Sequence, residues 1–110
     1  MFTLFIFYLG GGILLILISL PLLFEKVKPN PFYGFRVPST LENPETWYAV
    51  NKFFASRLLV VGIVESLVSA VLYFVPGISV DSYAVSVLAV FVIAFSIALI
   101  QSWNYLKSIR

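Results

Sequence analysis

The stretch KPNPFYGFRVPSTLENPETWYAVNKF, residues 28–53, is a polar segment between long hydrophobic ones, and it decides how the chain can fold. It holds four of the chain's six prolines, three asparagines and five charged residues. The whole chain of 110 residues is 61% hydrophobic and 11% charged, far from the average of soluble proteins. These proportions indicate an integral membrane protein, and the length allows one domain, residues 1–110.

Three hydrophobic segments surround this polar segment, one before it and two after it. A helix needs roughly 20 apolar residues to cross a hydrocarbon core about 30 Å thick. Segments 2–24 and 83–106 carry no charged residue, and segment 58–75 carries only Glu65. Pro76-Gly77 opens a short connector of the kind that joins antiparallel helices. The sequence therefore predicts an all-α integral membrane protein, a three-helix transmembrane bundle with an ordered cytoplasmic loop between helices 1 and 2.

The lysines and arginines predict how the chain is oriented in a cell membrane. No cation precedes Lys26, so the first segment lacks the basic start of a signal peptide and is expected to be retained. Cytoplasmic loops are enriched in Lys and Arg, and connector 76–82 has neither. We therefore expect a multi-pass protein with its N-terminus outside and its C-terminus cytoplasmic. The seven cations on the cytoplasmic side would be Lys26, Lys28, Arg36, Lys52, Arg57, Lys107 and Arg110.

The composition also narrows the class of function. The chain has no cysteine and no histidine, which removes disulfides, thiol nucleophiles, His-based triads and the usual zinc ligands. No pair of carboxylates stands at general acid/base spacing. We therefore expect no enzyme activity, no cofactor and no metal site. The net charge of +2 is explained by topology and by anionic lipid, so the expected partner is the lipid bilayer and not nucleic acid.

Within the polar segment, residues 28–57 read as an irregular loop followed by the start of a helix. The prolines forbid a regular helix across 28–38, and Gly34 indicates a turn with positive φ or close backbone packing. Asn43-Pro44-Glu45 is a strong helix start, with an N-cap, a proline at the first helical position and a carboxylate in the first turn. We expect the second helix to begin near Pro44, well before the hydrocarbon. Six residues at three- and four-residue spacing predict its buried face: Trp47, Asn51, Phe54, Leu58, Val61 and Glu65.

The same residues carry a resemblance to a known family. An N-x-x-Y-G-x-R-x-P turn, a short Ser/Thr stretch, an Asn and a Trp-x-x-x-Asn helix resemble the SdpI/YhfL-type immunity protein family over residues 30 to about 75. The resemblance implies a membrane protein that gives protection against a membrane-active peptide toxin by non-catalytic binding. Longer members have additional membrane helices, so a three-helix member could self-associate as a homo-oligomer or could have a different role. The residues of the motif are Asn30, Tyr33, Gly34, Arg36, Pro38, Asn43, Glu45, Trp47 and Asn51.

Two motif positions suggest roles that a structure can check. Arg36 is expected to pin the loop by pairing with Glu42 or Glu45, since a guanidinium suits a carboxylate; the alternative is direct contact with a ligand. Trp47 and Tyr48 are expected to be interfacial anchors, with a partner-binding surface as the alternative.

Glu65 is the one charged residue inside a predicted span. It would lie about 10 Å deep, where an ionised group costs at least a few kcal/mol unless it is paired, hydrated or protonated. Gln101, Asn104 and Arg57 are the expected partners, and the role is either structural or that of a site for a toxin, an ion or a proton. Small residues predict close helix packing, namely Gly10-Gly11-Gly12, Ser66-x-x-x-Ala70 and Ala94-x-x-x-Ala98.

Two other classes of function stay open beside immunity. One is a small membrane transporter using Glu65, since the length and the single membrane carboxylate are similar to small multidrug-resistance exporters. Those exporters have four spans with the Glu in the first, whereas this chain has three with the Glu in the second. The other is a membrane adaptor that docks a soluble partner on its cytoplasmic loop.

Overall fold

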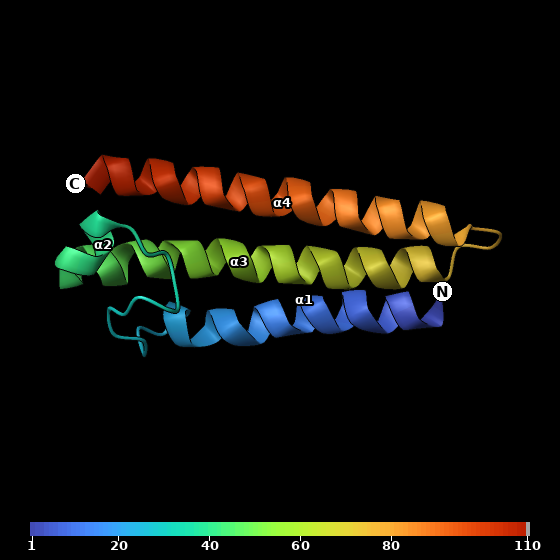
Figure 1. Cartoon of the computed structure of the whole chain (residues 1–110), viewed down its shortest axis with the longest axis horizontal. Helices are drawn as coiled ribbons and strands as arrows, with labels where there is room; N and C mark the ends of the chain where they lie inside the picture. The colour runs from blue at the N-terminus through green and yellow to red at the C-terminus, as the bar shows by residue number, and fades with distance from the viewer. Residues whose placement is uncertain (110) are drawn as a thin grey trace.

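Three long helices make up most of the chain in the computed structural model, which describes residues 1–109 (Figure 1). They are α1 (Phe2–Leu23), α3 (Pro44–Tyr73) and α4 (Val80–Ile109). Each is long and apolar enough to cross a membrane, and the described residues contain no strand. The predicted all-α architecture with three candidate spans is confirmed. Arg110, counted among the cations above, lies outside the described residues.

α3 and α4 are longer than the hydrophobic segments that predicted them, whereas α1 ends at Leu23, one residue short of its predicted limit. α3 begins at Pro44 as expected, and its 30 residues make it about 45 Å long, more than the hydrocarbon requires. α4 begins at Val80 and continues to Ile109, beyond the predicted limits of 83 and 106. Hydropathy marks where lipid contact begins, but a helix continues until a breaker residue or a cap stops it.

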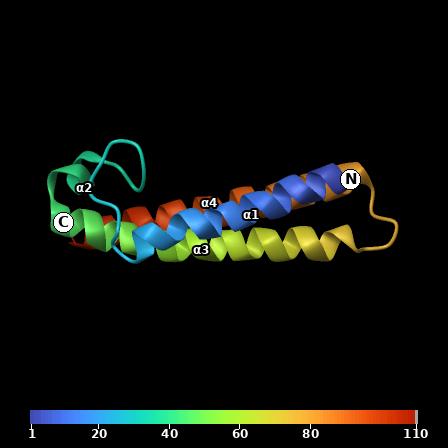
Figure 2. The ribbon, with the colours of Figure 1, turned by 90° about the horizontal axis from the view of Figure 1, so that it is seen from below.

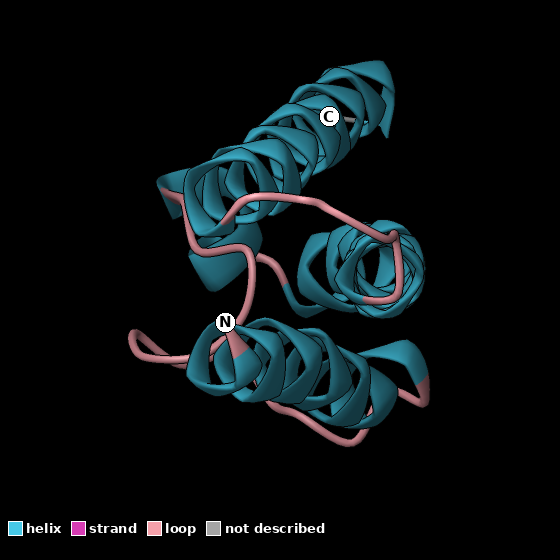
Figure 3. Ribbon diagram, turned by 90° about the vertical axis from the view of Figure 1, so that its right-hand side faces the viewer, coloured by secondary structure: helices cyan, strands magenta, loops and turns pink. Residues whose placement is uncertain are grey.

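α3 is the central helix, and both α1 and α4 pack against it (Figures 1 and 3). The long axis of the molecule measures 51 Å, and the other two measure 23 and 18 Å. The N-terminus and the α3–α4 connector lie at one end, called here the connector end. The loop between α1 and α3 folds back at the opposite end, and Figure 2 shows it projecting to one side of the bundle. We call residues 24–43 the cap, and this end the cap end.

The α1–α3 seam depends on glycines that let the two backbones touch. A Cβ added to Gly12 would lie 2.9 Å from the carbonyl oxygen of Gly62 and would also collide with the hydroxyl of Ser66. A Cβ added to Gly62 would lie 2.7 Å from the carbonyl oxygen of Gly12. Small residues at such a contact increase van der Waals packing, which drives helix association where no hydrophobic effect operates. The close packing predicted for the glycine run is therefore confirmed at Gly12.

Tyrosines hold α4 in place at both ends. At the connector end the Tyr83 hydroxyl donates to the Ser69 carbonyl at 3.0 Å, and the Tyr8 hydroxyl of α1 donates to the Ala84 carbonyl at 3.0 Å. At the cap end the ring of Tyr105 stacks on Phe53 with centroids 4.5 Å apart. These contacts set the register of α4 against α3.

The cap contains a short helix, α2 (Pro38–Glu42), that sequence reasoning did not predict. Pro38 was read only as a residue that prevents helix, whereas a proline in the first turn favours one, because its φ is already helical and its missing N–H is not needed there. The Thr40 hydroxyl accepts from the Val37 N–H at 3.0 Å and donates to the Phe35 carbonyl at 2.9 Å. Thr40 is fully buried, and its hydrogen bonds hold this five-residue helix against the preceding residues of the cap.

Candidate functional site

Asn51, buried on α3, is the residue to which the cap is attached. Its Oδ1 accepts from the Phe35 N–H at 2.5 Å, and its Nδ2 donates to the Phe35 carbonyl at 3.4 Å and to the Trp47 carbonyl at 3.0 Å. The side-chain amide thus pairs with both backbone groups of one cap residue, as a neighbouring strand would. With 1% of its surface exposed, Asn51 makes these bonds away from competing water.

Gly34 lies directly against this contact. Its φ of +112° lies in a region that residues with a Cβ rarely adopt. A Cβ there would also lie 2.7 Å from Oδ1 of Asn51 and 3.1 Å from the Trp47 ring. Both reasons that the sequence suggested for this glycine, positive φ and close backbone packing, are confirmed.

Trp47 is fully buried, so its expected role as an interfacial anchor is wrong. Its indole Nε1 donates to the Val27 carbonyl at 2.8 Å and ties the start of the cap to α3. The reason is that α3 begins before the hydrocarbon, so the cap covers its first turns. A residue with no exposed surface is not a partner-binding surface either, whereas Tyr48 beside it is half-buried.

Asn30 and Tyr33 shape the first half of the cap. Asn30 Oδ1 accepts from the N–H groups of Phe32 and Tyr33 at 2.9 and 2.8 Å, and its Nδ2 donates to the Lys28 carbonyl at 2.8 Å. The Tyr33 hydroxyl donates to the Ile18 carbonyl of α1. Burial raises the pKa of the Tyr33 phenol above its ordinary value, so it keeps the proton that this bond requires.

Arg36 does not make the ion pair expected of it. Its side chain is exposed, and its Nη1 donates to the Pro31 carbonyl at 3.3 Å; no ion pair joins it to Glu42 or Glu45 among the described residues. Exposed ion pairs contribute about 0–1 kcal/mol, whereas the buried amide of Asn51 satisfies backbone groups that would otherwise be unpaired. The cap is therefore held by Asn51 and Trp47 rather than by Arg36.

The remaining motif residues lie on the surface, where they start helices. Asn43 Oδ1 accepts from the N–H groups of Glu45 and Thr46 at 3.0 and 3.3 Å, the N-cap that the sequence predicted. Pro38 starts α2, and Glu45 lies exposed in the first turn of α3. The structure thus brings Tyr33, Gly34, Trp47 and Asn51 together. The other motif residues shape only the turn or helix start in which they lie. Thr40 belongs to the Ser/Thr stretch of the motif, but sequence reasoning assigned it no role, and its spacing of three residues from Val37 is the signal for the helix cap that it makes.

A small apolar cavity lies beneath the cap. Its volume is about 190 Å³, it is open to one side, and α1, α3, α4 and the cap all contribute to its wall. Tyr33 and Gly34 are the motif residues in that wall, so the motif closes the cap end of the cavity. The other lining residues are apolar: Leu15, Ile18, Leu22, Phe54, Leu58 and Phe95.

Glu65 lies in the α1–α3 seam with 6% of its surface exposed. A Cβ added to Gly11 would lie 3.0 Å from its Oε2, so the carboxyl group rests against the backbone of α1. No hydrogen bond or ion pair joins it to any residue that the structure describes. The described residues also hold no cluster of three or more His, Cys, Asp or Glu that could bind a metal ion.

The partners expected for Glu65 lie elsewhere. Gln101 and Asn104 are exposed on α4. Because Tyr105 stacks on Phe53 and the helices are antiparallel, Gln101 and Asn104 are level with residues two to three turns, or ~12 to ~17 Å, from Glu65 along α3. Arg57 lies at the level of Gln101 and faces α4 instead of α1. The predicted pairing is therefore wrong because the register of the helices separates these groups.

The fold and the cap define a class: a multi-pass membrane protein whose helices are fixed at one end by a structured polar loop. Comparison with family models matches residues 26–102 to the SdpI/YfhL protein family, and the chain belongs to this family. The match spans the cap, α3 and most of α4. No curated protein and no solved structure matches the chain.

Proposed function

We propose that this protein protects its host against a membrane-active peptide toxin by binding the peptide within the bilayer, without catalysis. Family membership supports the immunity role. The observation that carries the mechanism is the cavity whose cap end is closed by Tyr33 and Gly34. The most specific part of the sequence thereby shapes an apolar space beside membrane helices.

The cavity has the size and chemistry of a pocket for one apolar side chain. Its volume of about 190 Å³ compares with about 150 Å³ for an engineered apolar cavity that binds benzene. The apolar lining favours a Phe, Leu or Ile side chain of a membrane-active peptide. Inside the bilayer the cavity competes with lipid for that side chain only through shape complementarity and packing. The cap's role is then to hold α1, α3 and α4 at the spacing that keeps the cavity formed.

The sequence offered Glu65 as a possible site for a toxin and assigned the small residues to close helix packing. In the structure Gly12 and Ser66 contact each other in the α1–α3 seam, and Glu65 is buried there too, so the cavity is the better candidate for the recognition site. Those residues already pack α1 against α3.

The proposed orientation places the cap on the cytoplasmic side, where the lysines and arginines gather. A toxin arriving from outside would first meet connector 76–82 and would reach the cavity only by inserting between lipids. Recognition therefore takes place inside the bilayer.

Survival of a toxin-sensitive host expressing this chain tests the proposal. Leu15→Phe fills part of the cavity and should lower protection at least tenfold, because it removes the space for the peptide's side chain. Leu14→Phe is the matched control, since Leu14 is its neighbour but points outward with 57% of its surface exposed. Equal protection by both variants at equal membrane levels would exclude the cavity, and no protection by the parent chain against any peptide toxin would exclude immunity.

A transporter is the second candidate, because Glu65 is a buried carboxyl without a hydrogen-bond partner among the described residues. In such a site a proton is the simplest ligand, since the neutral acid avoids the cost of a buried charge. Glu65→Gln keeps the shape and neutrality of the protonated acid, so the fold and immunity should survive it. If the parent chain in vesicles moves cations or drugs down a proton gradient, and Glu65→Gln abolishes this movement, the transporter takes the place of immunity.

A further inference from the structure

A second groove, independent of the cavity beneath the cap, runs between α3 and α4 in the half of the molecule near the cap. Its volume is about 280 Å³. Arg57 and Gln101 are its polar residues, and they lie at its cap end. The rest of the lining is apolar and small or branched: Val60, Val61, Ala94, Ile97 and Ala98.

Arg57 lacks the partner that its position demands. Its Nε is buried and has no hydrogen-bond partner among the described residues. The guanidinium carbon lies 4.8 Å from the centre of the Phe53 ring, and Phe53 in turn stacks on Tyr105. The aromatic pair orients the planar guanidinium but does not neutralise it, and no ion pair to it occurs in the described part of the chain. A partly buried cation with an unused donor calls for an anion.

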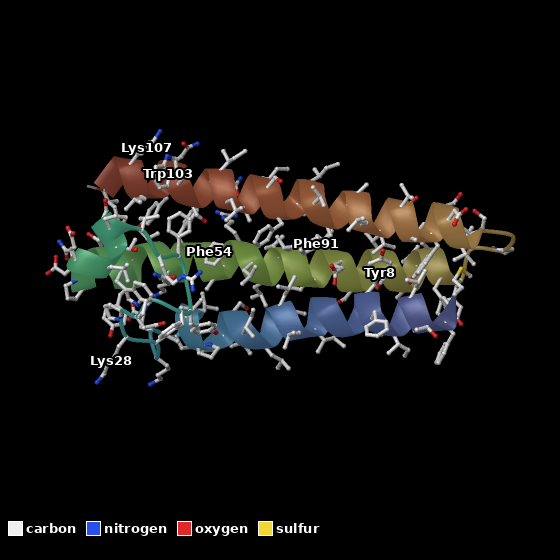
Figure 4. The ribbon with its side chains drawn as sticks, viewed as in Figure 1. Tyr8, Lys28, Phe54, Phe91, Trp103 and Lys107 are labelled. Carbon is white, nitrogen blue, oxygen red and sulfur yellow. The ribbon has the colours of Figure 1, made fainter. Side chains whose placement is uncertain are left out.

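The groove changes from polar to apolar along the membrane normal. Trp103 and Tyr105 mark the membrane interface on α4, because such rings collect at the level of the lipid headgroups. Arg57 and Gln101 lie just inside that level, and Figure 4 shows Trp103 and Lys107 at the cap end of α4. Val60 and Ile97, with 51% and 49% of their surface exposed, continue the groove toward the bilayer centre. This order matches a phospholipid, whose phosphate lies farther from the bilayer centre than its acyl chains.

We propose that the α3–α4 groove binds one anionic phospholipid. The phosphate accepts hydrogen bonds from Arg57, with the Gln101 amide beside it, and one acyl chain lies along Val60, Ala94 and Ile97. The groove faces the bilayer, so lipid is the molecule that occupies it. Its lining contains a cation, Arg57, and no carboxylate that could complement the cation of a zwitterionic headgroup. The headgroup selected is therefore one with net negative charge.

Electron spin resonance of spin-labelled lipids in vesicles that hold the purified protein tests this site. The probes are phosphatidylglycerol and phosphatidylcholine in a phosphatidylcholine host, at about 1 M salt, where the Debye length falls to ~3 Å and surface attraction is screened. The parent chain should immobilise phosphatidylglycerol in preference to phosphatidylcholine. Arg57→Gln should reduce that preference about tenfold, the effect of losing one charge-assisted contact.

Two further variants make the result decisive. Lys107→Gln removes one cation from the same end of α4 but outside the groove lining, and should change the preference by less than about twofold under screening. Ala94→Leu keeps Arg57 but fills the acyl part of the groove, and should lower phosphatidylglycerol immobilisation even if Arg57→Gln proves misfolded. No preference in the parent chain, equal loss in Arg57→Gln and Lys107→Gln, or full retention in Ala94→Leu would each overturn the proposal.

Discussion

Gly34 and Asn51 meet at a contact that leaves no room for a further atom. The positive φ of Gly34 turns the chain toward α3, and the absence of a Cβ lets the backbone reach Oδ1 of Asn51. The turn and the hydrogen bond depend on each other, because Asn51 can pair with Phe35 only if the chain approaches this closely. The strongest constraint in the cap is therefore steric.

Comparing two glycine substitutions separates the energetic cost of a steric collision from the cost of an unfavourable φ. Gly34→Ala should lower the free energy of unfolding by about 3 kcal/mol, because it adds a collision to an unfavourable φ. Gly77→Ala is the control: Gly77 has φ +77° but nothing within 4 Å of an added Cβ, so the cost should be about 1 kcal/mol. Titration with sodium dodecyl sulfate in mixed micelles measures both, and equal costs would contradict the steric argument.

A second comparison tests which residue holds the cap. Asn51→Ala leaves the Phe35 N–H without its buried partner and should cost about 2 kcal/mol of unfolding free energy. Arg36→Lys should cost less than about 0.5 kcal/mol, because the exposed Arg36 makes only a long bond to a carbonyl. The same titration measures both variants. A larger loss for Arg36→Lys than for Asn51→Ala would restore Arg36 as the main anchor.

At the scale of the elements, α3 makes most of the buried contacts. All six residues predicted to share its buried face are buried in the structure. One end of that face meets the cap, the middle meets α1 through glycine, and the tyrosines of α4 close the other side. α1 meets α3 through backbone contact at the glycines, with the Phe5–Tyr73 ring stack at the connector end, whereas α4 is held by tyrosines, so the two interfaces should respond differently to substitution.

Substitutions in the glycine run test whether α1 packs on α3 through backbone contact at Gly12. Gly12→Ala should lower the free energy of unfolding by about 2 kcal/mol, because its Cβ would enter the space of Gly62 and Ser66. Gly10→Ala, where nothing lies within 4 Å, should change it by less than about 1 kcal/mol. Thermal unfolding followed by circular dichroism compares the two. If Gly10→Ala were the more damaging, α1 would have to pack through a different face.

For the whole molecule, an odd number of spans puts the cap and the C-terminal end of α4 on the same side of the membrane. The lysines and arginines of the described residues all lie in the half of the molecule on this side, and connector 76–82 has none. The asymmetry predicts the orientation from charge alone, through the preference of cytoplasmic loops for cations.

Reporter fusions measure that orientation directly. Fusions after Lys28 and after Arg110 should both report a cytoplasmic location, and a fusion at Gly77 should report an external one. Moving three lysines into connector 76–82 should weaken or reverse the assignment, which serves as the control for the charge argument. A cytoplasmic signal at Gly77 in the parent chain would contradict the predicted topology.

The sequence alone determined the features that depend on neighbouring residues or on the pattern of hydropathy along the chain. Hydropathy identified three spans, Asn43 and Pro44 marked the start of α3, Gly34 marked a positive φ, and periodicity identified the buried face of α3. These predictions hold because the energies involved, lipid transfer, backbone sterics and helix capping, depend on residues near each other in the chain. α2 was missed because Pro38 was taken only as a helix breaker.

Only the tertiary structure decided which groups meet. It buried Trp47, left Arg36 exposed, separated Glu65 from its expected partners and placed Arg57 in a groove with an unused donor. Each outcome depends on the register of one helix against another, which glycine contacts and ring stacking set over distances of many residues. A shift of two turns along α3 changes every neighbour of a side chain while leaving hydropathy and periodicity the same, so no local pattern could have revealed it.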